Sequence, residues 1–181
     1  MAKTKRIILG VSGSIAAYKA ADILRRFLDK GHTVCVVMTK EAERFVTPLT
    51  FSSLCGEKVY TDMFSDEASA WKMPHIELAK GTDVFLIAPA TANIISKLAC
   101  GIADDLLTCI ALGTKAPILI APAMNTEMYH NKILQENCEK LKKHGVRFIE
   151  PTKGKLACGV IGEGHIADID DIVDAVLKVL K

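Results

Sequence analysis

The chain has 181 residues, half of them hydrophobic and 24% charged, with a formal net charge of +2 at pH 7. A chain of this length and composition is expected to form one globular domain with its own hydrophobic core. The near balance of charge argues against a nucleic-acid-binding surface and against a polybasic membrane-binding segment. No apolar run reaches the roughly 18–20 residues of a membrane span, and no apolar signal segment opens the chain, so we expect a cytoplasmic protein.

Short apolar segments alternate along the chain with segments of helical period. Strands are predicted, in chain order, at 6–11, 33–39, 83–91, 116–125 and 146–150, and Val59 and Tyr60 are interpreted as the start of another short strand. Helices are predicted at 16–31, 47–56, 93–101, 104–113, 131–145 and 169–181. The stretch 61–74 has no clear period and is predicted to be a loop.

The predicted strands are apolar throughout instead of alternating with polar residues. Such strands are typical of a parallel sheet that is covered by helices on both faces. Together with the strand–helix alternation, this predicts an α/β fold, a doubly wound, Rossmann-like parallel sheet in a single domain over residues 1–181. Ligands of such folds bind at the carboxyl ends of the strands. We therefore expect the functional residues in the loops that follow the strands.

The loop after the first predicted strand, GVSGSIAAYK, resembles a phosphate-binding turn. Gly13 would let the backbone approach an anion, and Ser14 would donate from its hydroxyl at a helix N-terminus. A plain tight turn with a serine N-cap explains the same residues equally well. The loop matches neither GxGxxG nor GxxxxGK[ST], and the second strand ends in Thr39 instead of an acidic residue that could hold a ribose. This pattern argues against NAD and ATP as ligands.

Two later strands end in the same Ala-Pro-Ala sequence, and polar or adaptable residues follow each of them. Thr91 and Asn93 could contact a phosphate or the edge of a heterocycle, or simply cap the next helix. Asn125 could hydrogen-bond a carboxylate or an amide. Met124 and Met128 could offer soft apolar surfaces to an aromatic ring system, or fill the core. Neighbouring strands of this kind could form two walls of one flat slot.

Two further residues could transfer protons. His75 follows a proline and is interpreted either as a proton-transferring residue at physiological pH or as an ordinary surface or N-cap residue. The segment 153–165 holds four glycines and is predicted to be a mobile flap, within a flexible region of about 151–168, and not a helix. Cys158 in this flap is a candidate acid or nucleophile, or else a passive thiol. The six cysteines show no CxxC pair and no metal-finger spacing, so we expect free thiols and no bound metal.

Six motifs occur in order over nearly the whole chain: GVSGSIAAYK, PHIELAK, PATAN, GIADDLLT, APAMNTEMYHN and KLACGVIGEG. Taken together they resemble the homo-oligomeric flavin-containing cysteine decarboxylases, and within that family the branch that acts in coenzyme A biosynthesis. The resemblance implies bound FMN and no metal. It also implies a stand-alone form of an activity that bacteria often fuse to a downstream synthetase, with a separate synthetase supplying the substrate.

The resemblance assigns roles to particular residues. His75 matches the family's base, Cys158 its proton donor, and Asn125 the residue that binds the carboxylate at the substrate's cysteine end. The cofactor contacts that it implies are Gly13, Ser14, Ile15, Thr39, Thr91, Ala92, Asn93, Ile94 and Ala123. The further substrate contacts that it implies are Lys155, Ala157 and Ile166 in the flap.

The implied reaction converts 4′-phosphopantothenoyl-L-cysteine to 4′-phosphopantetheine. Oxidation of the thiol to a thioaldehyde supplies the electron sink that lets carbon dioxide leave, and protonation by Cys158 and re-oxidation of the flavin complete the cycle. Relatives that decarboxylate lantibiotic peptides lack this cysteine, so its presence favours the coenzyme A branch. The alternatives are a peptidyl-cysteine decarboxylase of the lantibiotic type, a non-catalytic flavin-binding regulatory protein, and an electron-transfer flavoprotein.

The resemblance further implies homotrimers, sometimes assembled into dodecamers, whose neighbouring subunits share each site. His75 would then act in a site completed by another chain. Some positions depart from the family pattern. Ile94 stands where threonine is common and loses a hydrogen bond to phosphate, whereas Tyr129 replaces a tryptophan and would keep an aromatic wall. In the flap, His165 and Ile166 replace a small or basic residue and a methionine.

Overall fold

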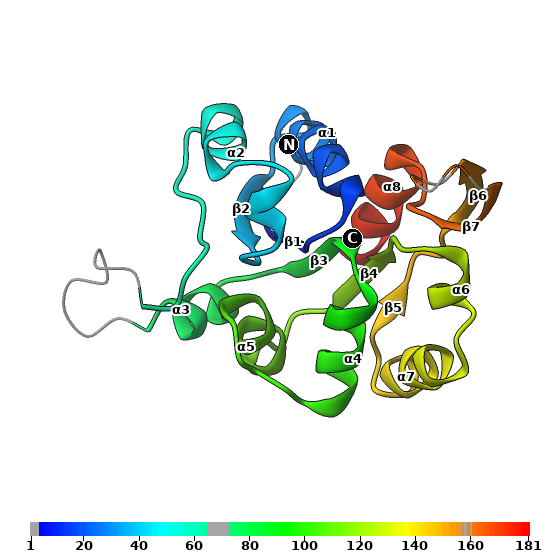
Figure 1. Ribbon diagram of the computed structural model, residues 1–181. Coiled ribbons are helices and arrows are strands. Elements are labelled where there is room, and N and C mark those ends of the chain that lie inside the picture. The colour runs from blue at the N-terminus through cyan, green and yellow to red at the C-terminus, as the bar shows by residue number, and fades with distance from the viewer. Residues whose placement is uncertain (1–3, 65–72, 156, 158, 160) are drawn as a thin grey trace.

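The computed structural model describes residues 4–64, 73–155, 157, 159 and 161–181. At its centre is a five-stranded parallel sheet with the order β2-β1-β3-β4-β5 (Figure 1). The strands are β1 (Arg6–Val11), β2 (Thr33–Met38), β3 (Val84–Ala90), β4 (Ile118–Pro122) and β5 (Arg147–Phe148). The strand order reverses direction between β1 and β3, which makes that boundary the switch point of the fold.

Helices cover both faces of this sheet, above and below it in Figure 1. One face carries α1 (Lys19–Asp29), α2 (Pro48–Cys55) and α8 (Ile169–Val179), and the other carries α3 (Pro74–Lys80), α4 (Ala92–Cys100), α5 (Leu106–Gly113) and α7 (Lys132–Lys143). The predicted doubly wound α/β fold is therefore confirmed. Shorter elements are the 3-10 turns η1 (Ile15–Tyr18) and η2 (Ala42–Arg44) and the one-turn helix α6 (Thr126–Tyr129). Among the described residues, none of the helices is both long and apolar enough to cross a membrane.

Alternate side chains of each strand enter different cores. In β1, Ile7, Leu9 and Val11 pack in the core that includes α1 and α8, whereas Ile8 packs in the core of the opposite face. These four side chains are completely buried, and each such burial contributes about 1.5–3 kcal/mol relative to exposure. Burial on both faces explains why the strands are apolar without a period of two.

The segment after β5 differs from the loop that was expected. Its described residues form an antiparallel pair of strands, β6 (Thr152–Lys155) and β7 (Ile161–His165). The exclusion of a helix is confirmed. The strands escape sequence analysis because glycine adds no side chain to the alternation by which a strand is recognised. We keep the name flap for this segment, and its mobility stays a prediction.

Two other assignments need correction. Pro74 begins helix α3 instead of ending a loop, since proline suits the first helical position, where its missing N–H is not needed. This helix has seven residues and buries Leu78 and Ala79, so it carries little periodic signal. Tyr60 makes a single parallel bridge to Val37 and does not begin a strand.

Candidate active site

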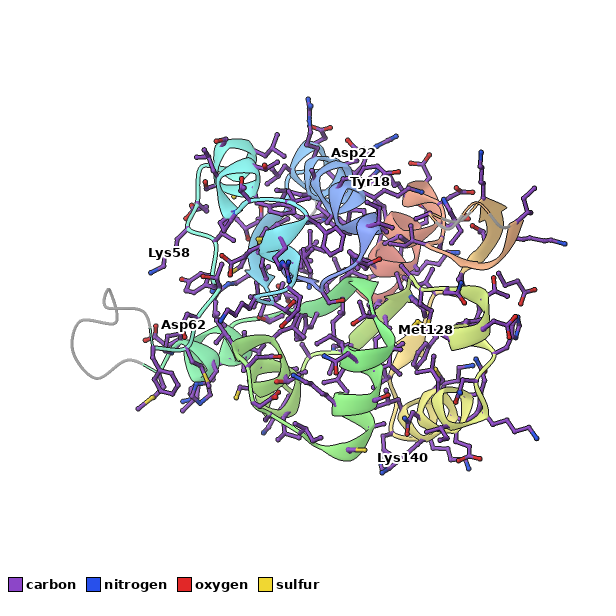
Figure 2. The ribbon with its side chains drawn as sticks, viewed as in Figure 1. Tyr18, Asp22, Lys58, Asp62, Met128 and Lys140 are labelled. Atoms are coloured by element: carbon purple, nitrogen blue, oxygen red, sulfur yellow. The ribbon has the colours of Figure 1, made fainter. Side chains whose placement is uncertain are left out.

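A cavity of about 720 Å³ lies at the carboxyl edge of the sheet. The loops after β1, β2, β3 and β4 and the flap all contribute to its wall, as the position of ligands in doubly wound sheets predicts. The described residues with a predicted cofactor or substrate contact that line it are Gly13, Ser14, Ile15, Thr39, Thr91, Ala92, Asn93, Ile94, Ala123, Asn125, Lys155, Ala157 and Ile166. Figure 2 shows two further lining residues, Tyr18 beside α1 and Met128 on the α6 segment.

Ser12 joins the two loops on either side of the switch point. Its amide donates to the Pro89 carbonyl at 3.2 Å, and its hydroxyl donates to the same oxygen at 2.8 Å. The Thr91 amide donates to the Ser12 hydroxyl at 3.0 Å. Because Ser12 is 1% exposed, these bonds satisfy a buried polar group and hold the ends of β1 and β3 together. Sequence analysis did not single out Ser12. A serine directly after an apolar strand does indicate a buried hydroxyl that needs hydrogen-bond partners.

Two helix starts present backbone N–H groups to the cavity. The Ser14 hydroxyl accepts from the Ala16 amide at 3.3 Å, and the Thr91 hydroxyl accepts from the Ile94 amide at 3.4 Å, so the capping role of both residues is confirmed. Neither cap excludes a bound anion, because other backbone amides at the two helix starts remain free to donate to it. The amides of Gly13, Ile15, Ala92 and Asn93 line the cavity, and among the described residues these four have no hydrogen-bond acceptor.

Gly13 is required by a contact between two loops. A Cβ built on Gly13 would lie 2.4 Å from the Cβ of Glu41, in the loop after β2. Any side chain at this position would therefore push the β1 and β2 loops apart. Sequence analysis attributed the glycine to the approach of an anion, and the structure adds this packing requirement, which depends on a residue far away in the chain.

The charged lining residues are few. Glu41 is acidic, and Lys19 and Lys155 are basic. Sequence analysis did not predict a role for the charge of any of these three side chains. Thr39 directly follows β2, so the strand ends one residue earlier than predicted. Thr39 is 4% exposed, and its hydroxyl accepts a hydrogen bond from the Ala42 amide at 3.3 Å. The described part of the cavity therefore has more positive than negative groups, in addition to the helix starts.

The loop after β4 places Asn125 and two methionines at the cavity. Asn125 caps α6, and its Oδ1 accepts from the Glu127 amide at 2.8 Å. Met128 is 49% exposed, so the interpretation that it fills the core is wrong. Met124 is half-buried against the core of the α4 and α5 face and also lines the cavity, so both interpretations apply to it.

The flap forms the remaining wall. Lys155 and Ala157 are exposed at the cavity, whereas Ile166 is 1% exposed and packs in the core that includes α8. The His165 Nδ1 lies 2.9 Å from the Ile166 carbonyl, to which it can only donate. Ile166 therefore anchors the end of the flap to the core, in addition to lining the cavity.

Tyr129 is not among the described residues that line this cavity, so the aromatic wall at this position stays a prediction. Its hydroxyl donates to Glu150 Oε2 at 2.6 Å and ties α6 to the segment after β5. Burial of the hydroxyl, together with the Glu150 carboxylate, raises the pKa of Tyr129 well above its usual range.

His75 lies away from the cavity, in the first turn of α3, which packs against α5. The N-cap of that helix is Met73, so the N-cap interpretation of His75 is wrong. The His75 Nδ1 is buried and has no hydrogen-bond partner among the described residues. Unpartnered buried nitrogens are uncommon, and Met73 and Ile76 expose apolar surface beside this one.

Cys158 lies outside the described residues, so its predicted role stays a prediction. The other five cysteines are free thiols. Within the described part of the chain, no group of three or more His, Cys, Asp or Glu side chains could hold a metal ion.

The model of the Flavoprotein family matches residues 1–181. The chain belongs to the Flavoprotein family. This flavoprotein is 45% identical over 175 residues to the "probable phosphopantothenoylcysteine decarboxylase" of Streptococcus mutans, and the match covers 96% of this chain and 97% of the relative. It is 47% identical over 164 residues to the coenzyme A biosynthesis bifunctional protein CoaBC of Vibrio vulnificus, of which it spans 41%. The flavoprotein thus spans less than half the length of that bifunctional relative.

Solved structures agree with this assignment. A PPC decarboxylase variant complexed with pantothenoylaminoethenethiol superposes on the flavoprotein with a TM-score of 0.87 at 34% identity, covering 97% of this chain and 98% of that one. The FMN-dependent cysteine decarboxylase SpaF superposes with a TM-score of 0.84 at 29% identity, covering 98% of each chain. The family and the fold that the six motifs predicted are therefore confirmed.

Proposed function

We propose that this flavoprotein binds FMN and decarboxylates 4′-phosphopantothenoyl-L-cysteine to 4′-phosphopantetheine in coenzyme A biosynthesis. The observation that carries the proposal is the cavity at the switch point, which the loops of four strands and the flap line together. The name of the Streptococcus mutans relative and the titles of the two solved structures support the same chemistry. A cytoplasmic location belongs to this proposal.

The cavity fits FMN in size and in chemistry. Its volume of about 720 Å³ falls within the range of about 300–1,000 Å³ that is typical of small-molecule sites. The two helix starts offer backbone amides and positive dipole ends for a phosphate. Small and soft side chains, Ala92, Ala123 and Met124, offer apolar surface for a flat ring system. We therefore assign the nine predicted cofactor contacts, from Gly13 to Ala123, to FMN.

FMN, when bound, supplies a hydride acceptor and later a hydride donor for the carbon that bears the substrate thiol. The chain's own residues would bind and orient the substrate. Asn125 would hydrogen-bond the carboxylate that leaves, and His75 would assist removal of the thiol proton. Lys155 in the flap would contact the substrate, and Cys158 would protonate carbon after carbon dioxide has left.

The shared site is also part of the proposal. In this chain His75 lies outside the cavity that Asn125 lines, and its Nδ1 has no partner among the described residues. A homotrimer, alone or within a dodecamer, would bring the His75 of one chain to the cavity of another. A separate synthetase would supply the substrate.

Release of labelled carbon dioxide tests the proposal. Purified protein loaded with FMN is incubated with phosphopantothenoylcysteine that is labelled at the cysteine carboxyl carbon. We expect label in the gas phase with the holoprotein and none with the flavin-free protein. Retention of the label by protein that has bound FMN would contradict the proposal.

Two substitutions test the assigned roles, each beside a matched control. His75→Asn and Asn125→Asp should lower carbon dioxide release by about 10²-fold or more, the scale of lost acid–base catalysis and of a misplaced substrate. His144→Asn, at the exposed end of α7, should leave the rate unchanged. Asn131→Asp alters another N-cap whose Oδ1 accepts from an amide, at 3.0 Å, but Asn131 does not line the cavity, so it should also be neutral. Full activity of either site variant would remove that residue from the mechanism.

A further inference from the structure

Strand β7 of the flap lies against the loop that carries Asn125. The Met124 amide donates to the Gly164 carbonyl at 3.0 Å. The Thr126 hydroxyl donates to the Glu163 carbonyl at 2.7 Å. The two bonds flank Asn125 in the chain, one on either side, so the backbone of Asn125 is held between two ties to the same strand.

Two glycines of the flap make this contact possible. A Cβ built on Gly162 would lie 2.2 Å from the Thr126 Oγ1, and one built on Gly164 would lie 2.3 Å from the Met124 carbonyl oxygen. Gly164 also has a φ of +120°, which residues with a side chain rarely adopt. Both glycines are buried although their neighbours Ile161 and Glu163 are exposed. These glycines therefore serve close packing and not only flexibility.

A third contact joins the same two segments. The His130 Nε2 lies 3.1 Å from the Glu163 Oε2, and each side chain is 53% exposed. An exposed pair of this kind contributes little by itself. The pair shows, however, that the contact between β7 and the α6 segment extends beyond Thr126. Because the exposed pair contributes little, the hydrogen bond of the Thr126 hydroxyl is the better target for substitution.

We propose that Thr126 is a positioning residue, which holds Asn125 in place for the substrate carboxylate by anchoring its loop to strand β7. Asn125 itself offers Oδ1 to the Glu127 amide at 2.8 Å, so its orientation depends on the backbone of this short turn. A helix of four residues has little stability of its own, and an external anchor is needed to fix it. The role in binding rests on the proposed function, whereas the anchor itself does not.

The test compares Thr126→Val with Thr126→Ser and with Thr33→Val. Valine keeps the shape of threonine and removes the hydroxyl, whereas serine keeps the hydroxyl. Thr33 is a matched control, because its hydroxyl also donates to a backbone carbonyl, that of Lys5 at 3.3 Å, and Thr33 begins β2 at the edge of the sheet opposite the cavity. Each variant is assayed as the FMN-loaded protein with phosphopantothenoylcysteine.

We expect Thr126→Val to raise the KM for phosphopantothenoylcysteine by about three- to tenfold, the scale of one lost hydrogen bond, with a smaller change in kcat. Inhibition by 4′-phosphopantetheine, which lacks the carboxylate, should change less than the KM. Thr126→Ser should restore the wild-type KM, and Thr33→Val should match the wild type. Equal weakening of substrate and product, or an unchanged KM, would overturn the proposal.

Amide hydrogen exchange keeps the two proposals apart. In Thr126→Val, the Met124 amide should exchange faster than in the wild type, with or without FMN, because its partner strand is less firmly held. If the Met124 amide exchanges faster in Thr126→Val but the wild type releases no carbon dioxide, the proposed function fails and the anchor stands. An unchanged exchange rate at Met124 would refute the anchor, whatever the activity.

Discussion

At the scale of single residues, the cavity is lined by two asparagines that look alike in the sequence, although only one of them caps a helix. Asn93 is the second residue of α4, Asn125 is the N-cap of α6, and both line the cavity. A capping residue can therefore also line the cavity. Residue types at strand ends predicted part of the wall, including Gly13, Thr91 and Asn125, and the family resemblance supplied the other predicted contacts. The hydrogen-bond partners of Ser12 and Tyr129 lie far away in sequence, at Pro89 and Glu150, and local patterns do not reveal these partners.

Gly13→Ala tests the packing of the cavity loops. The new Cβ would collide with the Glu41 Cβ, so we expect a loss of about 1–3 kcal/mol in the free energy of unfolding and weaker retention of FMN. Urea unfolding and the flavin absorbance of purified protein measure these effects. Gly113→Ala is the control, since its nearest neighbour beyond its own helix would be the Ala79 Cβ at 3.8 Å. Equal stability of Gly13→Ala and the wild type would show that the loops separate without cost.

At the scale of elements, the strands of the central sheet followed from continuous apolar runs and the long helices from their period, whereas α3, β6 and β7 did not. Helix α3 has seven residues, and it lies next to the stretch 65–72, outside the described residues. Strands β6 and β7 are rich in glycine and pair mainly with each other. Elements of this kind are defined by their tertiary neighbours and not by an apolar stripe, which explains why sequence analysis missed them.

Helix α5 offers a test at this scale, because α3 packs against it and carries His75. Asp105 and Thr108 form a capping box, with the Thr108 amide donating to the Asp105 Oδ1 at 2.8 Å. We expect Asp105→Ala to lower the free energy of unfolding by about 0.5–2 kcal/mol, measured by urea unfolding.

Asp104→Ala is the matched control for this helix cap. Asp104 binds Lys97 at 2.7 Å, as Asp105 does at 3.3 Å, but Asp104 caps no helix and its side chain is 56% exposed, so its loss should have little effect. The hydrogen bond from Lys97 lowers the pKa of Asp104, so that contribution is present near neutral pH and is lost as the pH falls through the folded-state value. Equal effects of the two substitutions would show that the ion pairs, and not the cap, stabilise α5.

At the scale of the whole molecule, the described residues form a cavity, and His75 lies outside it. The sequence predicted this division through the resemblance to a family of homo-oligomers. The single chain supports it with the unpartnered Nδ1 of His75 and the exposed apolar side chains of Met73 and Ile76. The cavity wall and the surface around His75 would then be two halves of one site.

Mixed oligomers test the shared site. His75→Asn and Asn125→Asp subunits, each inactive alone, are co-expressed and purified together. If sites form between chains, random mixing should leave about one quarter of the sites with both residues intact, and carbon dioxide release should recover to that fraction. A blend of the separately purified oligomers is the control. No recovery in verified mixed oligomers would mean that each chain uses its own His75.

The mass of the product that the purified, FMN-loaded protein forms from phosphopantothenoylcysteine decides whether the protein carries out the proposed reaction. We predict a product lighter than the substrate by carbon dioxide alone, which requires oxidation, decarboxylation and reduction in one cycle. A product that lacks two further hydrogens would contradict this account and favour a peptidyl-cysteine decarboxylase type of chemistry. An unchanged substrate, with FMN bound to the protein, would contradict it as well and favour a regulatory or electron-transfer flavoprotein.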